Sequence, residues 1–434
     1  MSVSMSVLTL LLLLVLFLGA GTWIFAGLML VGAGAMYFAL DFSWVRIGSI
    51  ATKVVSSSAV SWELAAIPIF IWMGDIIFRT DISNRLFRGL SPLVSRIPGG
   101  LLHTNVIGCT IFAAISGSST ATTATVGKIT IPELKARGYD VSLASGSLAG
   151  AGSFGLLIPP SIAMIVYGVL AQVSIAKLFA AGLLPGVMMA ALYSGYIALV
   201  SLIRPSVAPP HGEPVSWSVV LRGLLDLVPI LVLMTIVLGA IYTGVATPSE
   251  AAAVGVFGAI VITLVTRQFS WQLMADSLKS TIRVSSMILM LIAASAFLSS
   301  AIAYMHLPTM ITESIAAMNL SPYGVLLILA VLYIVLGMFL DGTSMTVMTV
   351  PIAVPLIVHA GFDPLWFGVY LVIMIEMSAL TPPVGLNLFI LQALTGETIG
   401  KTVRAALPFF LLLCIGTALL AVFPQIVLWL PNTL

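Results

Sequence analysis

The sequence Ile115-Ser116-Gly117-Ser118-Ser119-Thr120-Ala121-Thr122 places a small, hydroxyl-rich turn inside an apolar run that extends from 100 to 133. Residues on both sides of this turn are compatible with a helix. We interpret it as the tip of a hairpin that enters a membrane and returns to the side that it left. Such a tip requires a bilayer around it, a second copy of itself and a broken helix that faces it. The rest of the sequence contains candidates for all three.

The composition identifies the bilayer as the solvent of this chain. Of its 434 residues, 60% are hydrophobic and 7% are charged, with a mean hydropathy of +1.19, whereas globular domains carry about 25% charged residues. The net charge of +2 is too small for a polybasic surface, so no nucleic acid is expected as a partner. Cys109 and Cys414 lie in apolar segments without ligand-like spacing, and we expect neither a disulfide nor a metal there.

Ten apolar runs are long enough to span a bilayer, which takes about 20 residues. They lie near 4–20, 22–40, 63–79, 141–172, 183–203, 224–243, 247–266, 284–304, 365–394 and 406–430. The first could be a signal peptide, but residues 1–6 contain no Lys or Arg for the positive region that such a peptide requires. Two further runs, 100–133 and 323–359, are interrupted in the middle, so each is either two tight crossings or one re-entrant hairpin.

The basic residues orient these spans. Suppose that the N-terminus lies outside, that each span crosses once and that both hairpins return to the side that they left. Of the 17 Lys and Arg residues, only Arg46, Lys53 and Lys177 then fall outside, and all the others fall inside. This distribution follows the positive-inside bias and predicts that both termini lie outside. The count does not separate a re-entrant hairpin from two full crossings, because both leave the charges on the same side.

The second half of the chain repeats the first with a shift of about 224 residues. Four pairs of anchors share this shift: Ser116-Gly117-Ser118-Ser119 with Asp341-Gly342-Thr343-Ser344, Gly138-Tyr139-Asp140 with Gly361-Phe362-Asp363, Ile158-Pro159-Pro160 with Thr381-Pro382-Pro383, and Ile175-Ala176-Lys177 with Ile399-Gly400-Lys401. Each half contains five crossings, an odd number, so the two copies must be inverted relative to each other. Inverted repeats are typical of secondary transporters, whose site lies where the repeats meet.

We therefore predict an all-α membrane protein of two inverted repeats, divided in the Pro-rich linker at 205–221. Repeat 1 covers 1–210, with a hairpin at 100–133 and a broken helix at 141–172. Repeat 2 covers 211–434, with a hairpin at 323–359 and a broken helix at 365–394. Segments 43–60 and 268–282 are expected to be arms in the membrane interface. Segment 80–97, with apolar residues on one helical face, is either an interfacial helix or a cytoplasmic loop.

Four interruptions of the apolar runs are the predicted positions for binding an ion or an anion. They are tip 1 (residues 116–119), tip 2 (341–344), break 1 (158–161) and break 2 (380–385). Proline removes a backbone donor and clashes with the preceding turn, so each Pro-Pro pair should split its span into two half-helices. Unpaired backbone groups at such a break must be buried in protein or line an aqueous site. Carbonyl and hydroxyl oxygens suit Na⁺, and half-helix N-termini suit an anion. The alternatives are a simple kink at Pro-Pro and close helix packing at the small residues.

Acidic residues in apolar runs are a second signal, because an acid within a membrane is a functional candidate. Asp341 stands at tip 2 where tip 1 has Ser116, although it could instead cap the half-helix that begins at Gly342. Asp75 and Glu376 are weaker candidates. The histidines at 103, 306 and 359 show no triad or metal-ligand spacing.

Six motifs carry a resemblance: Ile115-Ser-Gly-Ser-Ser-Thr-Ala-Thr122, Ile131-Pro-Glu-Leu-Lys-Ala-Arg-Gly-Tyr-Asp140, Leu157-Ile-Pro-Pro-Ser161, Thr247-Pro-Ser-Glu-Ala-Ala-Ala253, Gly337-Met-Phe-Leu-Asp-Gly-Thr343 and Leu380-Thr-Pro-Pro-Val-Gly-Leu-Asn-Leu388. Over nearly the whole chain the sequence resembles the DctM-like large membrane subunit (M subunit) of tripartite ATP-independent periplasmic (TRAP) transporters. The resemblance implies an elevator-type transporter rather than an enzyme, in which the hairpins and broken helices form a transport domain and the other spans and arms form a scaffold.

The resemblance also implies a Na⁺ gradient as the driving force, a small organic acid as the imported substrate, and two partners. The partners are a small four-span membrane subunit (Q type) and a periplasmic substrate-binding protein (P type). The implied Na⁺ site 1 comprises Ser116, Gly117, Ser118, Ser119, Ile158, Pro159, Pro160 and Ser161. The implied Na⁺ site 2 comprises Gly342, Thr343, Ser344, Thr381, Pro382, Pro383, Gly385 and Asn387. The substrate candidates are Ser119, Thr120, Asp341, Thr343 and Asn387. Glu376-Met377-Ser378-Ala379 departs from the small-residue pattern of the family.

Other classes of function are distinguishable from this one. An intramembrane hydrolase would need an activated nucleophile, and no Ser or Cys here lies in a nucleophile-elbow sequence. A stand-alone Na⁺/carboxylate cotransporter of the related inverted-repeat fold would share the hairpins and broken helices but would need no partner. A passive channel would not accumulate its solute against a gradient.

Overall fold

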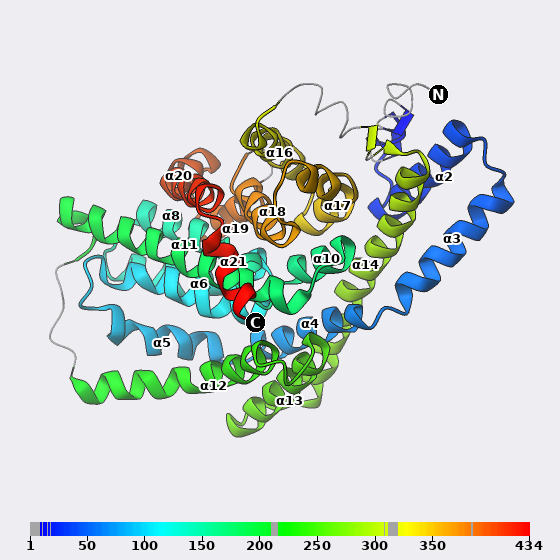
Figure 1. The fold of residues 1–434 in the computed structure, drawn as a ribbon. Helices are drawn as coiled ribbons and strands as arrows, with labels where there is room; N and C mark the ends of the chain where they lie inside the picture. Colours follow the sequence, from blue (N-terminus) through cyan, green and yellow to red (C-terminus); the bar gives the residue numbers. More distant parts are fainter. Residues whose placement is uncertain are drawn as a thin grey trace.

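The computed structural model describes residues 9–10, 12–14, 16–17, 19–209, 216–307, 309–310, 320–382 and 385–434. Within these ranges every regular element is a helix, as predicted for an all-α membrane protein (Figure 1). Six of the described helices are long and apolar enough to cross a membrane, and the number rises to eight if each of two bent helix pairs forms one span.

The described part of the first half of the chain consists of α-helices and three short 3-10 helices. They are α2 (Ile24–Leu40), α3 (Trp44–Ala59), η1 (Trp62–Ala65), α4 (Ala66–Phe78), α5 (Ile82–Val94), η2 (Gly100–Leu102), α6 (His103–Ser116), α7 (Ser119–Ala136), α8 (Val141–Gly152), α9 (Phe154–Leu157), α10 (Ile162–Ala171), α11 (Ile175–Ile203) and η3 (Pro205–Val207). The predicted amphipathic segment at 80–97 is confirmed as a helix, α5, which buries Leu86, Leu90 and Val94 on one face. Leu86 and Leu90 face Gly108 of α6, whereas α12 packs against α5 at Gly89.

The second half contains α12 (Trp217–Tyr242), α13 (Pro248–Val265), α14 (Trp271–Tyr304), α16 (Pro322–Gly337), α17 (Gly342–His359), α18 (Pro364–Ala379), α19 (Leu386–Thr395), α20 (Ile399–Val422) and α21 (Gln425–Thr433). The structure differs from the sequence prediction at 268–282, which is not a separate arm. This segment forms the first part of α14, a single helix of 34 residues. The reason is local, because no Gly or Pro interrupts the sequence from Trp271 to Tyr304.

Fewer helices reach spanning length than the ten predicted crossings. Two of the predicted spans fall on helices that are apolar but short: 22–40 on α2, with 17 residues, and the first part of 365–394 on α18, with 16 residues. A helix of 17 residues rises about 26 Å, slightly less than the thickness of a hydrocarbon core of about 30 Å. The predicted first span, 4–20, is described only at residues 9–10, 12–14, 16–17 and 19–20.

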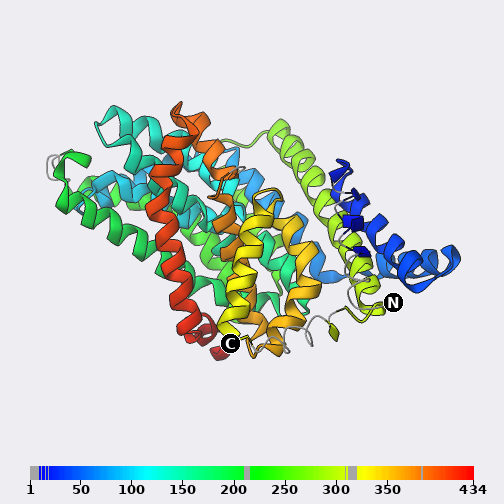
Figure 2. The same ribbon diagram turned by 90° about the horizontal axis from the view of Figure 1, so that it is seen from above.

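Helices of the two halves pack against each other in pairs. α2 and α4 contact α14, α4 contacts α13, and α5 contacts α12; α7 contacts α19, α8 contacts α20, and α10 contacts α17. Both ribbon views show α14 beside α2 and α3 at one edge of the molecule (Figures 1 and 2), and α14 also contacts α17. The helices thus gather into an outer group (α2–α5 and α12–α14) and an inner group that contains both hairpins and both broken helices.

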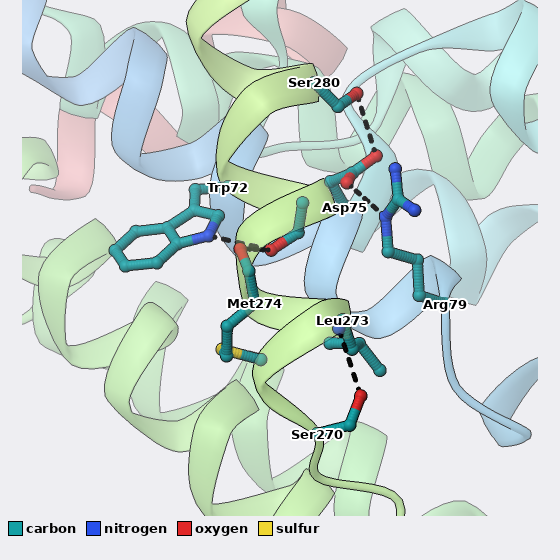
Figure 3. A network of polar contacts seen from close by, with 8 residues as sticks. Trp72, Asp75, Arg79, Ser270, Leu273, Met274 and Ser280 are labelled. Carbon is teal, nitrogen blue, oxygen red and sulfur yellow. Dashed lines mark hydrogen bonds and ion pairs between the residues drawn. The ribbon is translucent and has the colours of Figure 1, made fainter.

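Polar contacts join α4 to α14 within the outer group (Figure 3). Trp72 donates its indole N–H to Ser277 Oγ at 3.1 Å, and Ser280 donates its hydroxyl to Asp75 Oδ1 at 3.3 Å. The other carboxylate oxygen of Asp75 pairs with Arg79 Nε at 2.7 Å. Asp75 therefore has partners on both oxygens, and it ties the two halves of the chain together.

Replacing Ser277 by alanine is expected to lower the stability of the protein by about 1–3 kcal/mol, because the half-buried indole N–H of Trp72 loses its acceptor, the buried Ser277 hydroxyl. Ser280→Ala is the matched control on the same helix face. It removes a longer contact to a carboxylate that keeps Arg79, so we expect a loss of less than about 1 kcal/mol. The measurement is the thermal unfolding temperature of the purified protein in detergent. Equal shifts in the two variants would contradict the role given to Ser277.

Candidate functional site

Tip 1 is a tight turn between two helices. α6 ends at Ser116, Gly117 adopts a left-handed conformation with φ of 56°, and α7 begins at Ser119. The sequence supplies each step: glycine tolerates the positive φ, and the Ser118 hydroxyl caps α7 by accepting from the backbone N–H of Ala121. Ser116 Oγ accepts from the Ser118 backbone N–H at 3.1 Å and lies 2.6 Å from Thr122 Oγ1. The hydroxyls of the predicted turn therefore brace the turn itself.

Tip 1 lies directly against break 1. A Cβ atom on Gly117 would lie 3.1 Å from the carbonyl oxygen of Pro160. On the other side of the tip, a Cβ on Gly155 would lie 2.5 Å from backbone atoms of Ser118 and Ser119. These backbones approach so closely that only glycine fits. The structure thus brings together the two segments of the implied Na⁺ site 1.

Break 1 separates helices that differ in direction by 40°. The chain leaves α9 at Leu157, passes through a cis Pro159-Pro160 peptide bond, and enters α10 at Ile162, where Ser161 Oγ accepts from the backbone N–H of Met164 at 3.3 Å. Residues 158–161 are all buried. The break therefore presents non-helical backbone to the protein interior, which is the only place where a membrane protein tolerates it.

Tip 2 is capped by its own acid. Asp341 Oδ2 accepts from the backbone N–H groups of Thr343 at 3.0 Å and Ser344 at 3.2 Å, and Oδ1 accepts from the Ser344 hydroxyl. Both oxygens of Asp341 are therefore engaged by the first turn of α17. Of the two interpretations that the sequence left open for Asp341, the structure shows the helix cap.

Contacts place tip 2 against α18 and α9. A Cβ on Gly342 would lie 2.5 Å from Ile375 Cγ2 and 3.6 Å from Leu156 Cδ1. At the end of the preceding helix, a Cβ on Gly337 would lie 2.0 Å from Ser378 Oγ. Tip 2 therefore meets α18 one to two turns before break 2.

Break 2 separates α18 from α19. Thr381 closes the end of α18 by donating its hydroxyl to the Met377 carbonyl at 2.8 Å, and α19 starts after Gly385, whose φ is 45°. Pro382 is exposed, and Pro383 lies outside the described residues. Asn387 in the first turn of α19 is fully buried, and neither its amide oxygen nor its amide nitrogen has a hydrogen-bond partner among the described residues. A buried amide without partners is costly unless a ligand completes it.

Glu376, a weaker candidate from the sequence alone, lies at a contact between the two halves of the chain. It is 1% exposed, and its Oε1 accepts a hydrogen bond from Ser119 Oγ across 257 positions of the chain. Its other oxygen, Oε2, has no partner among the described residues. Asp341 is satisfied locally, whereas Glu376 links tip 1 to the second half. A carboxylate in an otherwise apolar helix was visible in the sequence, but its partner was not.

A separate cavity of about 850 Å³ opens at the opposite end of α6 from tip 1. Its lining includes Arg88, Arg96, Leu101, Arg137, Tyr139 and Pro205. α6 has 14 residues and spans about 21 Å, so this cavity lies far from the tip. Its arginines belong to the side that the charge distribution predicts to be inside.

The fold and its interrupted helices define a multi-pass membrane protein. The structure is similar to that of the YdaH transporter of Alcanivorax borkumensis, with a TM-score of 0.61 at 14% sequence identity over 89% of each chain. MtrF of Neisseria gonorrhoeae gives a TM-score of 0.58 at 14% identity, over 89% of this chain and 84% of that one.

The sequence model described as "Tripartite ATP-independent periplasmic transporter, DctM component" matches residues 9–426, and the chain belongs to that family. A C4-dicarboxylate TRAP transporter large permease protein of Pseudomonas aeruginosa is 34% identical over 403 residues, which cover 93% of each chain. An ectoine/5-hydroxyectoine TRAP transporter large permease protein of Ruegeria pomeroyi is 33% identical, over 85% of this chain and 86% of the relative. An isethionate TRAP transporter permease protein, DctMQ, of Oleidesulfovibrio alaskensis is 31% identical, over 83% of this chain and 57% of the relative.

The resemblance drawn from the motifs is therefore confirmed. The chain is a permease component of a transporter and not an enzyme.

Proposed function

We propose that the chain is the permease subunit of a Na⁺-coupled, binding-protein-dependent secondary transporter, which imports a small organic acid by an elevator movement. One observation carries the proposal. Tip 1, tip 2, α9 and α18 converge around Leu156, Ile375 and Glu376, so that interrupted helices of both halves share one buried location. Such a meeting of repeats is where secondary transporters bind substrate and ions.

The residues present fit a Na⁺ ion. Break 1 and tip 1 offer buried backbone carbonyls, among them that of Pro160, and break 2 offers the unpartnered amide of Asn387. Hard oxygen ligands of this kind suit Na⁺. The residues that would hold the two ions are those implied by the sequence, 116–119 with 158–161, and 342–344 with 381–383, 385 and 387. When bound, Na⁺ supplies the positive charge and the gradient energy that an anion needs to enter this site.

The substrate is a small organic acid held without a basic side chain. The sequence contains no Lys or Arg at 97–127, 138–176 or 284–400, which include both tips and both breaks. Hydroxyls, amides and helix N-termini must therefore orient the solute, with Ser119, Thr120, Thr343 and Asn387 as candidates and Asp341 acting through its cap on α17. The named relatives, for C4-dicarboxylate, ectoine and isethionate, indicate the size of solute that this architecture accepts.

The division of the helices into two groups supports the proposed elevator movement of one group past the other. The inner group, with hairpins 100–133 and 323–359 and broken helices 141–172 and 365–394, forms the transport domain, and the outer group forms the scaffold. A small four-span subunit and a periplasmic binding protein complete the transporter, and both termini of the chain lie in the periplasm. The relative named DctMQ, of which this chain covers 57%, supports a second membrane component.

Reconstitution into proteoliposomes tests this function. With both partner proteins and an inward Na⁺ gradient, we expect a labelled organic acid from a panel to accumulate against its own gradient. Uptake by this chain alone would instead support a stand-alone cotransporter, and strictly downhill flux would support a channel.

Thr343→Ala is expected to raise the Na⁺ concentration for half-maximal uptake by about 3-fold to 10-fold, which is equivalent to the loss of one interaction of the size of a hydrogen bond. An unchanged Na⁺ dependence would show that Thr343 is not part of the site.

A further inference from the structure

The cavity of about 850 Å³ at the far end of α6 from tip 1 is separate from the proposed transport site. Its lining residues come from α5, α7, α11 and α12 and from the loops that follow α5, α7 and α11. Three arginine side chains and several apolar side chains share this lining. A ligand that fills the cavity is therefore expected to carry both negative charge and apolar surface.

Two of the arginines keep hydrogen-bond donors for a second anion. Arg88 Nη2 lies 3.2 Å from Asp81 Oδ2, and Arg137 Nε lies 3.3 Å from Glu133 Oε2. A guanidinium group carries five N–H donors, more than one carboxylate accepts from. Arg96 lines the same cavity. The three arginines exceed these two acids by one positive charge, which matches the one negative charge of a phosphodiester.

Two hydroxyl groups add neutral donors to the cavity. Ser201 is 8% exposed, and its Oγ has no hydrogen-bond partner among the described residues. Tyr139 Oη accepts from the backbone N–H of Leu101 at 3.1 Å, so its own proton is left to donate. A buried hydroxyl without a partner is unusual in a folded protein, and a ligand that accepts from Ser201 would satisfy it.

Exposed apolar side chains at the rim place the cavity at the surface of the bilayer. Helices α11 and α12 are both long and apolar enough to cross a membrane. Leu202 in the last turn of α11 and Val219 in the first turn of α12 line the cavity, and Leu202 is 65% exposed. Trp217, which begins α12, is 81% exposed, and tryptophan is enriched at membrane interfaces. A small soluble anion would leave this apolar rim uncovered.

We propose that the cavity binds the phosphodiester head group of an anionic phospholipid from the leaflet on the side that the charge distribution predicts to be inside. Arg88, Arg137 and Ser201 donate to the phosphate oxygens, and the acyl chains lie against Leu202 and Val219. Basic pockets between spans on the cytoplasmic side are typical sites for anionic head groups. The volume of the cavity lies within the range of small-molecule sites.

A lipid in this cavity contacts both groups of helices. Arg88 on α5 and Val219 on α12 belong to the outer group, whereas Arg137 follows α7 of the inner group. Because coupled equilibria are reciprocal, a change in the relative position of the groups changes the affinity for the lipid, and the lipid in turn favours one position. The binding site itself goes beyond the proposed function, since it involves neither the solute nor Na⁺.

The experiment measures lipid binding to the full chain, purified with its small membrane subunit in a neutral detergent. The unfolding temperature is followed in mixed micelles with rising mole fractions of phosphatidylglycerol, at constant ionic strength and without solute. Phosphatidylcholine with the same acyl chains is the zwitterionic comparison. Glycerophosphoglycerol supplies the same head group without acyl chains. We expect phosphatidylglycerol to raise the unfolding temperature and the other two compounds to give no comparable rise.

The double variant Arg88→Gln/Arg137→Gln removes two of the proposed donors. We expect the half-saturating mole fraction of phosphatidylglycerol to rise by at least about 10-fold. Both arginine side chains are more than half exposed, so the loss of their ion pairs should cost little stability. The double variant Lys279→Gln/Arg283→Gln is the matched control. It removes the same charge from exposed positions of α14 on the same predicted side, outside the cavity, and should match the wild type.

Ser201→Ala separates ligand binding from a purely structural role. The variant removes a buried hydroxyl that has no partner, so the lipid-free protein should be at least as stable as the wild type. The half-saturating mole fraction of phosphatidylglycerol should nevertheless rise by about 3-fold, as for the loss of one neutral hydrogen bond.

Each other outcome overturns the proposal. Equal stabilisation by phosphatidylcholine would show that the cavity does not recognise the negative charge, and stabilisation by glycerophosphoglycerol at similar concentrations would identify a free anion as the occupant. An equal loss in the control on α14 would show that net charge, rather than the cavity, attracts the lipid. Wild-type binding by both the arginine variant and Ser201→Ala would remove the site. If the arginine variant does not fold, Ser201→Ala alone decides.

Discussion

Replacing Gly155 by alanine is expected to abolish Na⁺-driven uptake. The new Cβ atom would lie 2.5 Å from backbone atoms of Ser118 and Ser119, and a backbone cannot rotate away as a flexible side chain can. Tip 1 must then separate from α9. A displacement of about 1 Å at a positioned site typically costs about 100-fold in rate, and we expect a loss of at least that size. The measurement is the initial rate of uptake in proteoliposomes, normalised to the amount of folded protein.

Gly195→Ala is the control for this change. Gly195 lies in α11, and a Cβ there would meet nothing within 4 Å. Alanine is also the better helix former, so uptake and stability should be at least those of the wild type. Wild-type uptake by Gly155→Ala would show that the contact between tip 1 and α9 is not needed for transport.

Replacing Gly74 by valine is expected to reduce uptake by at least about 10-fold while leaving Na⁺ binding intact. Gly74 lies on α4 of the outer group, and a Cβ there would lie 2.8 Å from the carbonyl oxygen of Ile115 beside tip 1. A larger side chain would push the two groups apart at a contact that the proposed elevator movement must make and break. The substitution alters none of the residues proposed as ion ligands.

Two measurements on one sample test this prediction, namely the uptake rate and the Na⁺-dependent unfolding temperature. Gly239→Val on α12 is the control, since a Cβ at Gly239 would meet nothing within 4 Å and the intrinsic helix propensity changes in the same way. If Gly74→Val lost Na⁺ stabilisation together with uptake, the change would have damaged tip 1 rather than the movement. Unimpaired uptake would mean that this contact does not limit transport.

Local chemistry made part of the site predictable. The turn at tip 1 and the break at Pro159-Pro160 follow from glycine, serine and proline at fixed positions, and both are present in the structure. The capping role of Asp341 was one of two readings that the sequence allowed, because an N-cap acts within three residues.

Contacts between the halves were not predictable. Ser119 and Glu376 are 257 positions apart, and no periodicity or spacing reports which helices meet at such a separation. The continuity of α14 was missed for a different reason, since mixed polar residues at 268–282 suggested an interfacial arm although nothing there terminates a helix. Whether a helical hairpin crosses a bilayer or returns depends on its surroundings rather than on its own residues.

Tip 1 and tip 2 share an electrostatic property that is not apparent from their sequences. The N-terminal end of a helix attracts negative charge, and at each tip the chain supplies that charge itself. Asp341 provides it for α17 from the adjacent residue, and Glu376 provides it for α7 from another helix. Under the proposed function, an organic acid that binds at either tip would compete with these groups. Its affinity would then reflect the difference between two anions rather than the attraction of vacant helix ends.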